Sequence, residues 1–357
     1  MPSASRIIIC AAGGGKTTRI VDEAARDDCR RSLLVTYTRN NGQEIGRKFY
    51  GIGPVIPSNI EVMTWFSFLL RELARPYRRV MHDKRIEGLH WEEGRSVRFI
   101  PESNTSGHYF AGGSHIYSDK IAKFVCECDR RASGAAMRRL AMRFDRIYVD
   151  EVQDLAGYDL EVLELILKAG IQVTLVGDHR QATFRTNQAK KNEAFTGINI
   201  IKKLRAWDKA GLAQLSYEQL TYRCHQDIAD LGDSFFPEEP PTTSLNTAVT
   251  GHDGVFIVAT TRVEAYVAAF EPQVLRFDRR TSCCDLPAMN FGESKGLTFD
   301  RALIFPHASA KKWLTTGNIR HVEKSRARMY VGVTRARYSL AFVHDGAAAI
   351  PGAQIYE

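Results

Sequence analysis

The sequence contains no apolar run long enough to cross a bilayer, which argues against a membrane protein. It has seven cysteines but no cysteine pairs at the spacing of a zinc site, so a structural metal centre is not expected. The first residues lack the basic start and apolar stretch of a secretion signal. We therefore expect reduced thiols, a cytoplasmic location and no membrane association.

The composition is that of a globular protein with an excess of basic residues. The 357 residues are 44% hydrophobic and 25% charged, so the chain is long enough for two lobes with separate cores. The formal net charge is +8. Positive charge favours an anionic partner such as nucleic acid, although it does not identify one.

Strand-like and helix-like patterns alternate along both halves of the chain, which is typical of parallel sheets covered by helices. In the first half we expect Arg6–Cys10, Thr17–Ala25, Leu33–Tyr37, Phe144–Val149, Asp159–Leu167 and Val173–Val176. In the second half we expect Val255–Ala259, Val263–Phe270, Val274–Phe277, Ala302–Phe305 and Leu340–Val343. The pattern predicts an α/β protein with a lobe over residues 1–208 and a lobe over residues 209–357.

Two segments interrupt this alternation. Residues 75–143 form a reduced insert that starts as charged, Gly- and Ser-rich loop and continues as a basic helical stretch from Asp119 to Arg143. Residues 236–252 are rich in Pro and Thr, and proline cannot donate to a helix or a central strand. We expect that second segment to be a loop or a reduced insert of the second lobe.

The stretch CAAGGGKTT, residues 10–18, joins the first strand to the first helix. Glycines allow backbone N–H groups to converge on phosphate oxygens, Lys16 reaches the outer phosphates, and the Thr17 hydroxyl is a Mg²⁺ ligand in such loops. The usual pattern has glycine where this chain has Cys10. Taken alone, the stretch leaves a plain glycine-rich turn open.

A second element supports phosphate binding. The strand Arg146–Val149 is followed directly by Asp150 and Glu151. This places two carboxylates at the carboxyl end of a sheet strand, where ligands of such sheets bind. We expect Asp150 to hold Mg²⁺ through water and Glu151 to orient and polarise the attacking water.

The segment VDEVQDL, residues 149–155, together with the rest of the chain, resembles superfamily 1A DNA helicases of the UvrD/Rep/PcrA type. Further similar segments follow the family order: LLVTYTRNNGQEI (33–45), MTWFSFLLREL (63–73), LVGDHRQATFR (175–185), LTYRC (220–224), ESKGLTFDRALIF (293–305) and RMYVGVTRAR (328–337). The resemblance implies two RecA-like P-loop NTPase lobes, hydrolysis of ATP with Mg²⁺, and movement on single-stranded DNA toward its 5′ end.

The resemblance also implies roles for individual residues. Gln181 would sense the γ-phosphate, Tyr222 would stack on adenine, and Arg223 and Arg335 would counter the charge of the transferred phosphoryl group. The implied catalytic set is Lys16, Asp150, Glu151, Gln181, Arg223 and Arg335, and the metal ligands are Thr17 and Asp150. The implied nucleotide contacts are Gly13, Gly14, Gly15, Lys16, Thr17, Thr18, Tyr222 and Gly296. The implied DNA contacts are Thr36, Tyr37, Thr64, Phe66, Phe184 and Ser294.

Several alternatives remain open at this point. No glutamine precedes Lys16, so the resemblance does not settle the choice of nucleotide base. Because both inserts are short, a DNA-stimulated ATPase that regulates a partner nuclease without robust unwinding is an alternative to a helicase. An RNA helicase is a third candidate. The basic run of Arg130, Arg131, Arg138, Arg139, Arg143 and Arg146 is either a phosphate contact or a solvated helix face.

Overall fold

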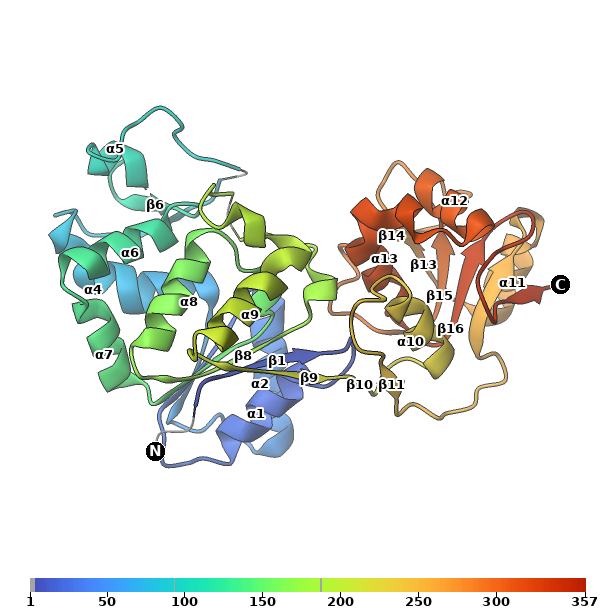
Figure 1. Ribbon diagram of the computed structural model, residues 1–357, viewed down its shortest axis with the longest axis horizontal. Helices are drawn as coiled ribbons and strands as arrows, with labels where there is room; N and C mark the ends of the chain where they lie inside the picture. Colours follow the sequence, from blue (N-terminus) through green and yellow to red (C-terminus); the bar gives the residue numbers. More distant parts are fainter. Residues whose placement is uncertain (1–3, 93, 187) are drawn as a thin grey trace. The chain divides into compact units, whose positions relative to one another are not determined.

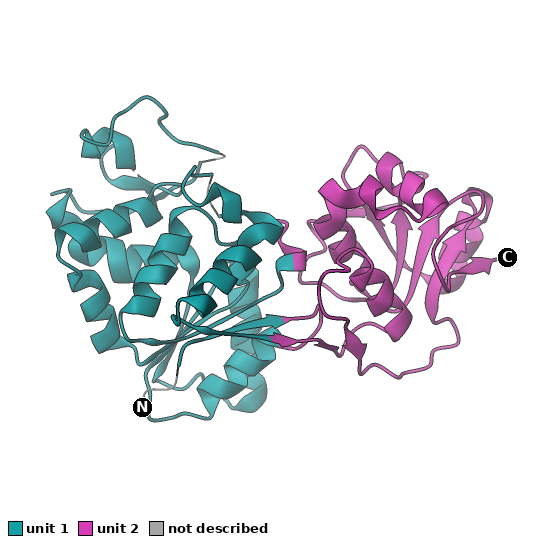
Figure 2. Cartoon of the chain, in the orientation of Figure 1, with its two compact units in different colours: residues 1–9, 16–179, 184–216 teal, residues 10–15, 180–183, 217–357 magenta. Residues whose placement is uncertain are grey.

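The structure is a computed structural model that describes residues 4–92, 94–186 and 188–357. It contains two compact units, shown separately coloured in Figure 2. Unit 1 comprises Met1–Ile9, Lys16–His179 and Phe184–Ser216, and unit 2 comprises Cys10–Gly15, Arg180–Thr183 and Tyr217–Glu357. The main division thus falls a few residues beyond the predicted boundary at 208/209. Two short segments that leave and re-enter unit 1, residues 10–15 and 180–183, are grouped with unit 2.

Unit 1 is built on a six-stranded sheet with the order β3-β2-β7-β8-β1-β9. Its strands are β1 (Arg6–Cys10), β2 (Ser32–Thr36), β3 (Ile60–Thr64), β7 (Arg146–Val149), β8 (Gln172–Gly177) and β9 (Gln214–Glu218). The pairs β1–β8, β2–β3, β2–β7 and β7–β8 are parallel. Strand β2 is buried at every position, as expected for a parallel strand covered on both faces.

Helices cover both faces of this sheet. α1 (Lys16–Ala25) and α2 (Arg39–Ile52) connect β1 to β2 and β2 to β3, so the chain moves toward the β3 edge of the sheet. α8 (Tyr158–Lys168) and α9 (Ile200–Lys209) connect β7 to β8 and β8 to β9, so the chain moves toward the β9 edge. Right-handed crossovers therefore place the two pairs on opposite faces, as Figure 1 shows. Short 3-10 turns join these elements at η3 (Val152–Asp154), η4 (His179–Gln181), η5 (Glu193–Phe195) and η6 (Gly197–Asn199).

The first insert is more ordered than predicted. It is preceded by α3 (Trp65–Phe68) and a π-helix η1 (Leu69–Ala74). It begins with α4 (Arg75–Tyr77) and η2 (Arg78–Val80) and continues with β4 (Gly88–His90), α5 (Thr105–Tyr109), β5 (Phe110–Ala111) and β6 (His115–Tyr117). Most of the stretch up to Ser114 is loop, as predicted, but β4, β6 and β5 form a small sheet that was not predicted. Strands of two or three residues are too short to show an alternating pattern. The basic helical stretch is two helices, α6 (Ile121–Arg131) and α7 (Ala135–Arg143), separated at Gly134, whose φ is +80°.

Unit 2 is also built on a six-stranded sheet, with the order β14-β13-β15-β16-β12-β17. Its strands are β12 (Gly254–Val258), β13 (Gln273–Arg276), β14 (Met289–Asn290), β15 (Phe299–Phe305), β16 (Ala336–Val343) and β17 (Gln354–Tyr356). All five neighbouring pairs are parallel. Its helices are α10 (Gln226–Asp233), η7 (Thr260–Arg262), α11 (Val263–Phe270), α12 (Ala308–Thr316), η8 (Ile319–Ser325) and α13 (Arg326–Val333). The predicted fold class, parallel sheets flanked by helices, agrees with both units.

The Pro- and Thr-rich segment of unit 2 is a loop, as predicted, apart from a short strand. β11 (Thr243–Ser244) pairs in parallel with β10 (Leu220–Thr221). A cluster under α11 forms a core that includes Phe256, Tyr266 and Leu303. Among the residues described, no helix combines the length and the apolar character needed to cross a bilayer.

Candidate nucleotide-binding site

The glycine-rich stretch forms a tight loop between β1 and α1. Gly13 and Gly15 have φ values of +75° and +76°, a left-handed conformation that L side chains rarely adopt. The Gly14 N–H donates to the Ala11 carbonyl over 3.0 Å. These glycines therefore serve the backbone conformation that a phosphate-binding loop requires.

The segment 220–223 packs directly against this loop within unit 2. The Tyr222 N–H donates to the Gly13 carbonyl over 3.1 Å, and the Thr221 hydroxyl donates to the Ala12 carbonyl over 2.7 Å. A Cβ on Gly13 would lie 2.5 Å from the Cβ of Arg223. Tyr222 is 63% exposed, and its ring would lie 3.8 Å from a Cβ on Gly15. The structure thus brings Tyr222 and Arg223, two predicted site residues, to the phosphate loop.

A second support of the loop was not predicted from the sequence. The Ala12 N–H donates to the buried Tyr330 hydroxyl over 3.3 Å. The Arg180 guanidinium lies 4.8 Å from the centre of the Tyr330 ring and forms an ion pair with Asp233 at 3.0 Å. Arg180 and Tyr330 lie inside segments quoted above for their family resemblance, but their roles depend on contacts between distant parts of the chain.

In unit 1, the first turn of α1 meets the carboxyl end of β7. The Thr17 hydroxyl donates to a carboxylate oxygen of Asp150 over 2.8 Å. Asp150 and Lys16 are both buried. Burial and the neighbouring Glu151 carboxylate raise the pKa of Asp150, whereas Lys16 and the Thr17 hydrogen bond act in the opposite direction. The Thr18 hydroxyl accepts a hydrogen bond from Lys48 over 2.9 Å.

Glu151 is held in an unusual conformation by its neighbours. Its φ is +55°, and its N–H donates to Asp150 over 2.9 Å. The buried Gln153 side chain donates its amide N–H to the Glu151 carboxylate. The same side chain accepts the Asp178 N–H over 3.1 Å, so it links the Glu151 carboxylate to the end of β8. The acidic segment 149–155 contains Gln153 but does not indicate this role, because the contact with Asp178 joins distant parts of the chain.

The donor set suits a hard cation. Thr17 and Asp150 offer a hydroxyl and a carboxylate, which are ligands that Mg²⁺ prefers. Among residues 4–92, 94–186 and 188–357, no group of three or more His, Cys, Asp or Glu side chains is arranged to hold a metal alone. A cation at Thr17 and Asp150 would therefore need further ligands from nucleotide phosphates and water, as is usual for Mg²⁺.

The predicted sensor and arginine of unit 2 contact each other. Arg335 is 1% exposed and donates to the Gln181 side-chain oxygen over 2.9 Å. It also donates to the carbonyls of Val331 and Leu297 over 2.9 and 3.1 Å. Arg223 donates to the Thr334 carbonyl over 2.9 Å. Gly296, with φ +87°, lies in the turn before Leu297.

The predicted DNA contacts differ in how exposed their side chains are. The side chains of Thr36, Phe66 and Ser294 are buried, and the Ser294 hydroxyl donates to the Phe291 carbonyl over 2.9 Å. That these three residues contact DNA stays a prediction, and their side chains are not at the surface here. Thr64 caps α3 through Ser67.

Tyr37 and Phe184 are the aromatic candidates left at the surface. Tyr37 is half-buried and Phe184 is exposed. A flat ring at the surface is a suitable partner for a nucleic-acid base. Both residues belong to unit 1.

The basic run is largely committed to ion pairs. Arg143 contacts Glu61 at 2.6 Å and the buried Glu72 at 2.9 Å. Arg139 also contacts Glu72, at 3.3 Å. Arg130 contacts Glu127 at 2.7 Å and Arg146 contacts Asp27 at 2.8 Å. These pairs favour a structural role for the run over a phosphate contact.

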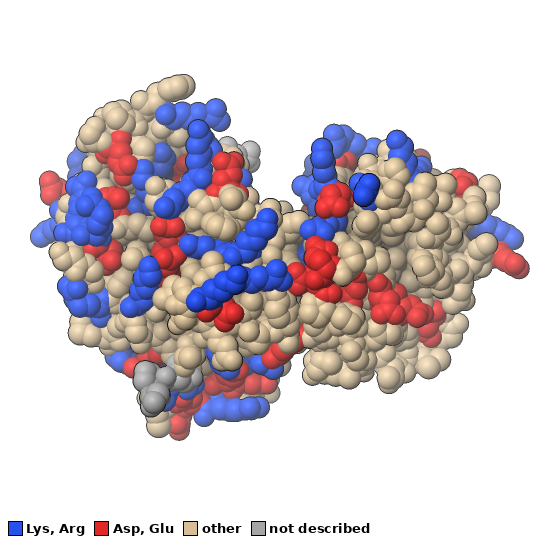
Figure 3. All heavy atoms as spheres, viewed as in Figure 1, with Lys and Arg blue, Asp and Glu red and all other residues tan. Residues whose placement is uncertain are grey.

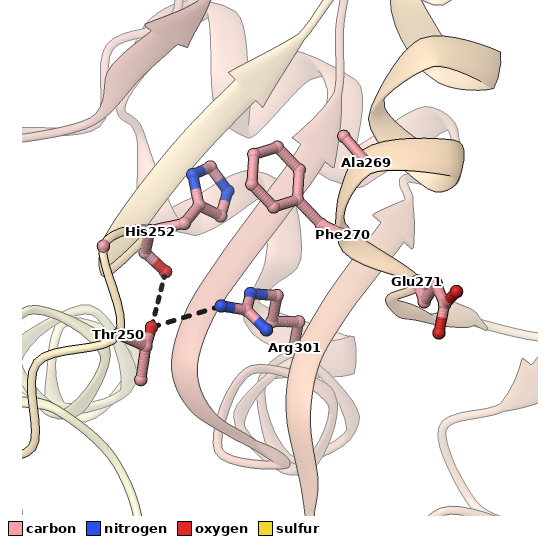
Figure 4. Close-up of a pocket in the computed structure, with 7 residues that line it drawn as sticks. Thr250, His252, Ala269, Phe270, Glu271 and Arg301 are labelled. Carbon is pink, nitrogen blue, oxygen red and sulfur yellow. Dashed lines mark hydrogen bonds between the residues drawn. The ribbon is translucent and has the colours of Figure 1, made fainter.

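A cavity of unit 2 lies apart from these residues. It has a volume of about 400 Å³, and Figure 4 shows Phe270 and Arg301 beside Thr250 and His252. Arg301 donates to the Thr250 hydroxyl over 3.2 Å. The His252 ring stacks between Phe256 and Phe270 at 3.9 and 3.7 Å, and burial and Arg301 lower its pKa. No predicted site residue lines this cavity.

Comparison with solved structures supports the fold. Arterivirus nonstructural protein 10, a helicase, in a complex with DNA aligns with a TM-score of 0.50 and 15% identity, over 98% of this chain and 62% of that chain. The same arterivirus helicase in another structure aligns with a TM-score of 0.49 and 14% identity, over 95% of this chain and 59% of that chain. This chain thus covers less than two thirds of these helicases. The first likeness confirms the predicted fold class, whereas the search of curated proteins gave no match.

One family model matches part of unit 1 together with the short segment of unit 2 that carries Gln181. Residues 114–196 match the model of the UvrD/REP helicase N-terminal domain. That range contains Asp150, Glu151, Gln153 and Gln181, and it agrees with the family that the sequence motifs predict. Over residues 114–196, the chain is therefore similar to the N-terminal domain of UvrD/REP helicases.

Proposed function

We propose that this protein is an ATP hydrolase that moves along single-stranded DNA from 3′ to 5′ and unwinds duplex DNA. The observation that carries the proposal is the 2.8 Å hydrogen bond between Thr17 and Asp150, next to the buried Lys16. It joins the end of a phosphate loop to an acidic strand end, which is the arrangement that nucleotide hydrolysis needs.

The residues of the site divide the chemical work. Backbone N–H groups of the glycine loop and the Lys16 ammonium would bind the phosphates of ATP. Glu151, held by Gln153, would accept a proton from the attacking water. Arg223, which lies against Gly13, would stabilise charge on the transferred phosphoryl group. Thr17 and Asp150 would hold Mg²⁺, which neutralises phosphate charge.

Nucleic acid is proposed as the partner on several grounds. The net charge is +8, and the family of residues 114–196 consists of helicases. The arterivirus helicase that aligns with this chain was solved with DNA. DNA, the 3′-to-5′ direction and a role in DNA repair, replication or phage defence follow the family resemblance of the motifs.

Strand displacement combined with ATPase assays tests this function. The substrates are duplexes with a 3′ or a 5′ single-stranded tail, and single-stranded DNA and RNA serve as ATPase activators. We expect DNA to stimulate hydrolysis and a 3′ tail to support displacement, with Lys16→Ala inactive in both assays. Displacement from 5′ tails would contradict the direction, and stronger stimulation by RNA would contradict the choice of DNA.

A second candidate is a DNA-stimulated ATPase switch that regulates a partner nuclease. It is favoured by the small size of the second insert, where β11 is the one strand found among the described residues 236–252. Little of that insert is available to engage a duplex. DNA-stimulated hydrolysis without displacement on either tail would favour this switch over a helicase.

A further inference from the structure

The loop that follows β4 exposes aromatic and basic side chains outside the helicase-like segments. Trp91 is 65% exposed and Phe99 is 96% exposed. Arg95 and Arg98 lie between them in the sequence and are also exposed. Large exposed apolar side chains with polar residues around them indicate an interaction site.

The Trp91 ring is supported from beneath. It packs edge-on against the buried Phe66, with ring centres 4.9 Å apart and an interplanar angle of 78°. Phe66 in turn lies 6.2 Å from Tyr37, a predicted DNA contact. The buried Phe66 therefore has a positioning role, because its ring contacts both Trp91 and Tyr37.

A second loop of unit 1 lies beside the first. Arg95 donates from its Nε to the Gln188 carbonyl over 2.8 Å, and a Cβ on Gly94 would lie 3.8 Å from the Gln188 side chain. This second loop carries the exposed residues Phe184, Arg185 and Lys190. Figure 3 shows that basic side chains are spread over the visible face of unit 1.

We propose that these two loops form a binding site for single-stranded nucleic acid, and we call it the aromatic-basic site. Its members are Trp91, Arg95, Arg98, Phe99, Arg185 and Lys190. The rings stack on bases, and the guanidinium and ammonium groups contact phosphates. A duplex does not fit this chemistry, because its bases are already stacked on each other.

This site deepens the proposed function and rests on it, since a translocase must hold a single strand. Apart from Arg185, which ends the segment 175–185, its members lie outside the helicase-like segments quoted above. Between Trp91 and Phe99 the sequence contains two acidic residues, Glu92 and Glu93, and Glu92 lies 3.5 Å from His90. The four basic members of the site outnumber these two acidic residues, and their charge complements a phosphate backbone.

Tryptophan fluorescence provides a direct test, because Trp91 is the exposed member of the four tryptophans. Trp65, Trp207 and Trp313 are all buried. Titration of the full-length protein with oligo(dT) in the absence of nucleotide should quench the emission, since a stacked base quenches an indole. In Trp91→Phe the quenching should disappear, while binding followed by anisotropy of a labelled oligonucleotide remains.

Affinity measurements test the other members. Trp91→Ala and Phe99→Ala should each weaken binding of single-stranded DNA between about five- and one hundred-fold, the range for one stacked base. Arg98→Ala should reduce the magnitude of the negative slope of log K against log salt by about 0.7, the value for one phosphate on a single strand. Tyr50→Ala, which removes an exposed ring from α2, is the matched control and should bind as the wild type does.

The outcomes separate this inference from the proposed function. If wild-type ATPase responds to single-stranded DNA but oligo(dT) leaves Trp91 emission unchanged, the aromatic-basic site is wrong and the proposed function stands. If no nucleic acid stimulates hydrolysis or binds, the proposed function fails. If wild-type protein binds DNA and Trp91→Ala binds equally well, the loops serve another partner, such as an acidic protein. Basal ATPase without DNA should be the same in all these variants.

Discussion

The buried guanidinium of Arg335 donates a hydrogen bond to the side-chain oxygen of Gln181 over 2.9 Å. The same guanidinium donates to two backbone carbonyls, of Val331 and Leu297. A group this buried and this fully bonded contributes to the stability of unit 2, whatever it contributes to hydrolysis. The two arginines assigned to catalysis therefore differ in burial, since Arg223 is only partly buried.

This difference predicts distinct outcomes for the two alanine variants. Arg335→Ala should lower the free energy of unfolding by roughly 1–3 kcal/mol or more, because buried carbonyls lose their donor. Arg223→Ala should lower ATPase activity with a much smaller loss of stability. Urea unfolding and steady-state ATPase assays on both variants check this. Equal unfolding midpoints for Arg335→Ala and wild type would show that Arg335 is not structural.

A second prediction concerns Gln153, which donates to Glu151 and accepts from Asp178. Gln153→Ala should reduce kcat on the order of 100-fold, with little change in the KM for ATP, because it releases the proposed base. In a Glu151→Gln background, the same substitution should have almost no further effect on kcat, since the two residues act as a unit.

The double variant is the control for a purely structural role. If Gln153→Ala acted through general destabilisation, its effect would add to that of Glu151→Gln. A thermal unfolding midpoint for each variant, measured alongside, separates a loss of folded protein from a loss of turnover.

The phosphate loop provides a third prediction with a matched pair of glycines. A Cβ on Gly14 would lie 2.7 Å from the Leu220 carbonyl oxygen and 3.0 Å from the Ala11 carbonyl oxygen. Because both neighbours are backbone atoms, Gly14→Ala should cost about 1–3 kcal/mol and weaken ATP binding at least about tenfold. Gly46→Ala, in α2 with open space around it, should instead stabilise the protein by about 0.5–1 kcal/mol.

Nucleotide-binding assays and urea unfolding measure both variants. Retention of wild-type affinity by Gly14→Ala would mean that the loop shifts to accommodate the methyl group. In that case the close approach to segment 220–223 would not determine the conformation of the loop.

The sequence predicted those parts of the fold and site that depend on neighbouring residues. The glycines before Lys16 and the carboxylates after β7 are short continuous segments at strand ends, so their location follows from the strand pattern alone. β9 continues the first sheet past the predicted boundary. This strand was not predicted, because its half-exposed residues carry no strong apolar pattern. The small sheet of the insert escaped prediction because its strands have two or three residues.

Residues whose roles depend on distant partners were not predictable. Three such residues are Gln153, Tyr330 and Arg180. Their partners are the end of β8, the phosphate loop and Asp233, respectively, and all three partners are distant in the sequence. The burial of Ser294 and Phe66 was not predictable either, since a motif position does not reveal whether its side chain is buried.

The last prediction concerns acid stability and Glu164 on α8. Its carboxylate accepts hydrogen bonds from Lys168 and Lys203, both at 2.7 Å, and from Trp207 at 3.0 Å. Partial burial acts to raise the pKa of Glu164, but these three donors outweigh it and lower the pKa to about 2. A carboxylate with a depressed pKa in the folded state stabilises the protein above its ordinary value of 4.5. That contribution is lost as the pH falls from 4.5 toward 2.

Glu164→Gln should therefore be less stable than the wild type at pH 7, by no more than about 1 kcal/mol because the group is partly solvated. The difference in the free energy of unfolding between the two proteins should narrow as the pH is lowered from 5 to 3, because the stabilisation by the wild-type carboxylate is progressively lost. Urea midpoints measured across this range report the difference directly. A difference that stayed constant with pH would mean that the packing of the side chain, and not its charge, stabilises the contact between α8 and α9.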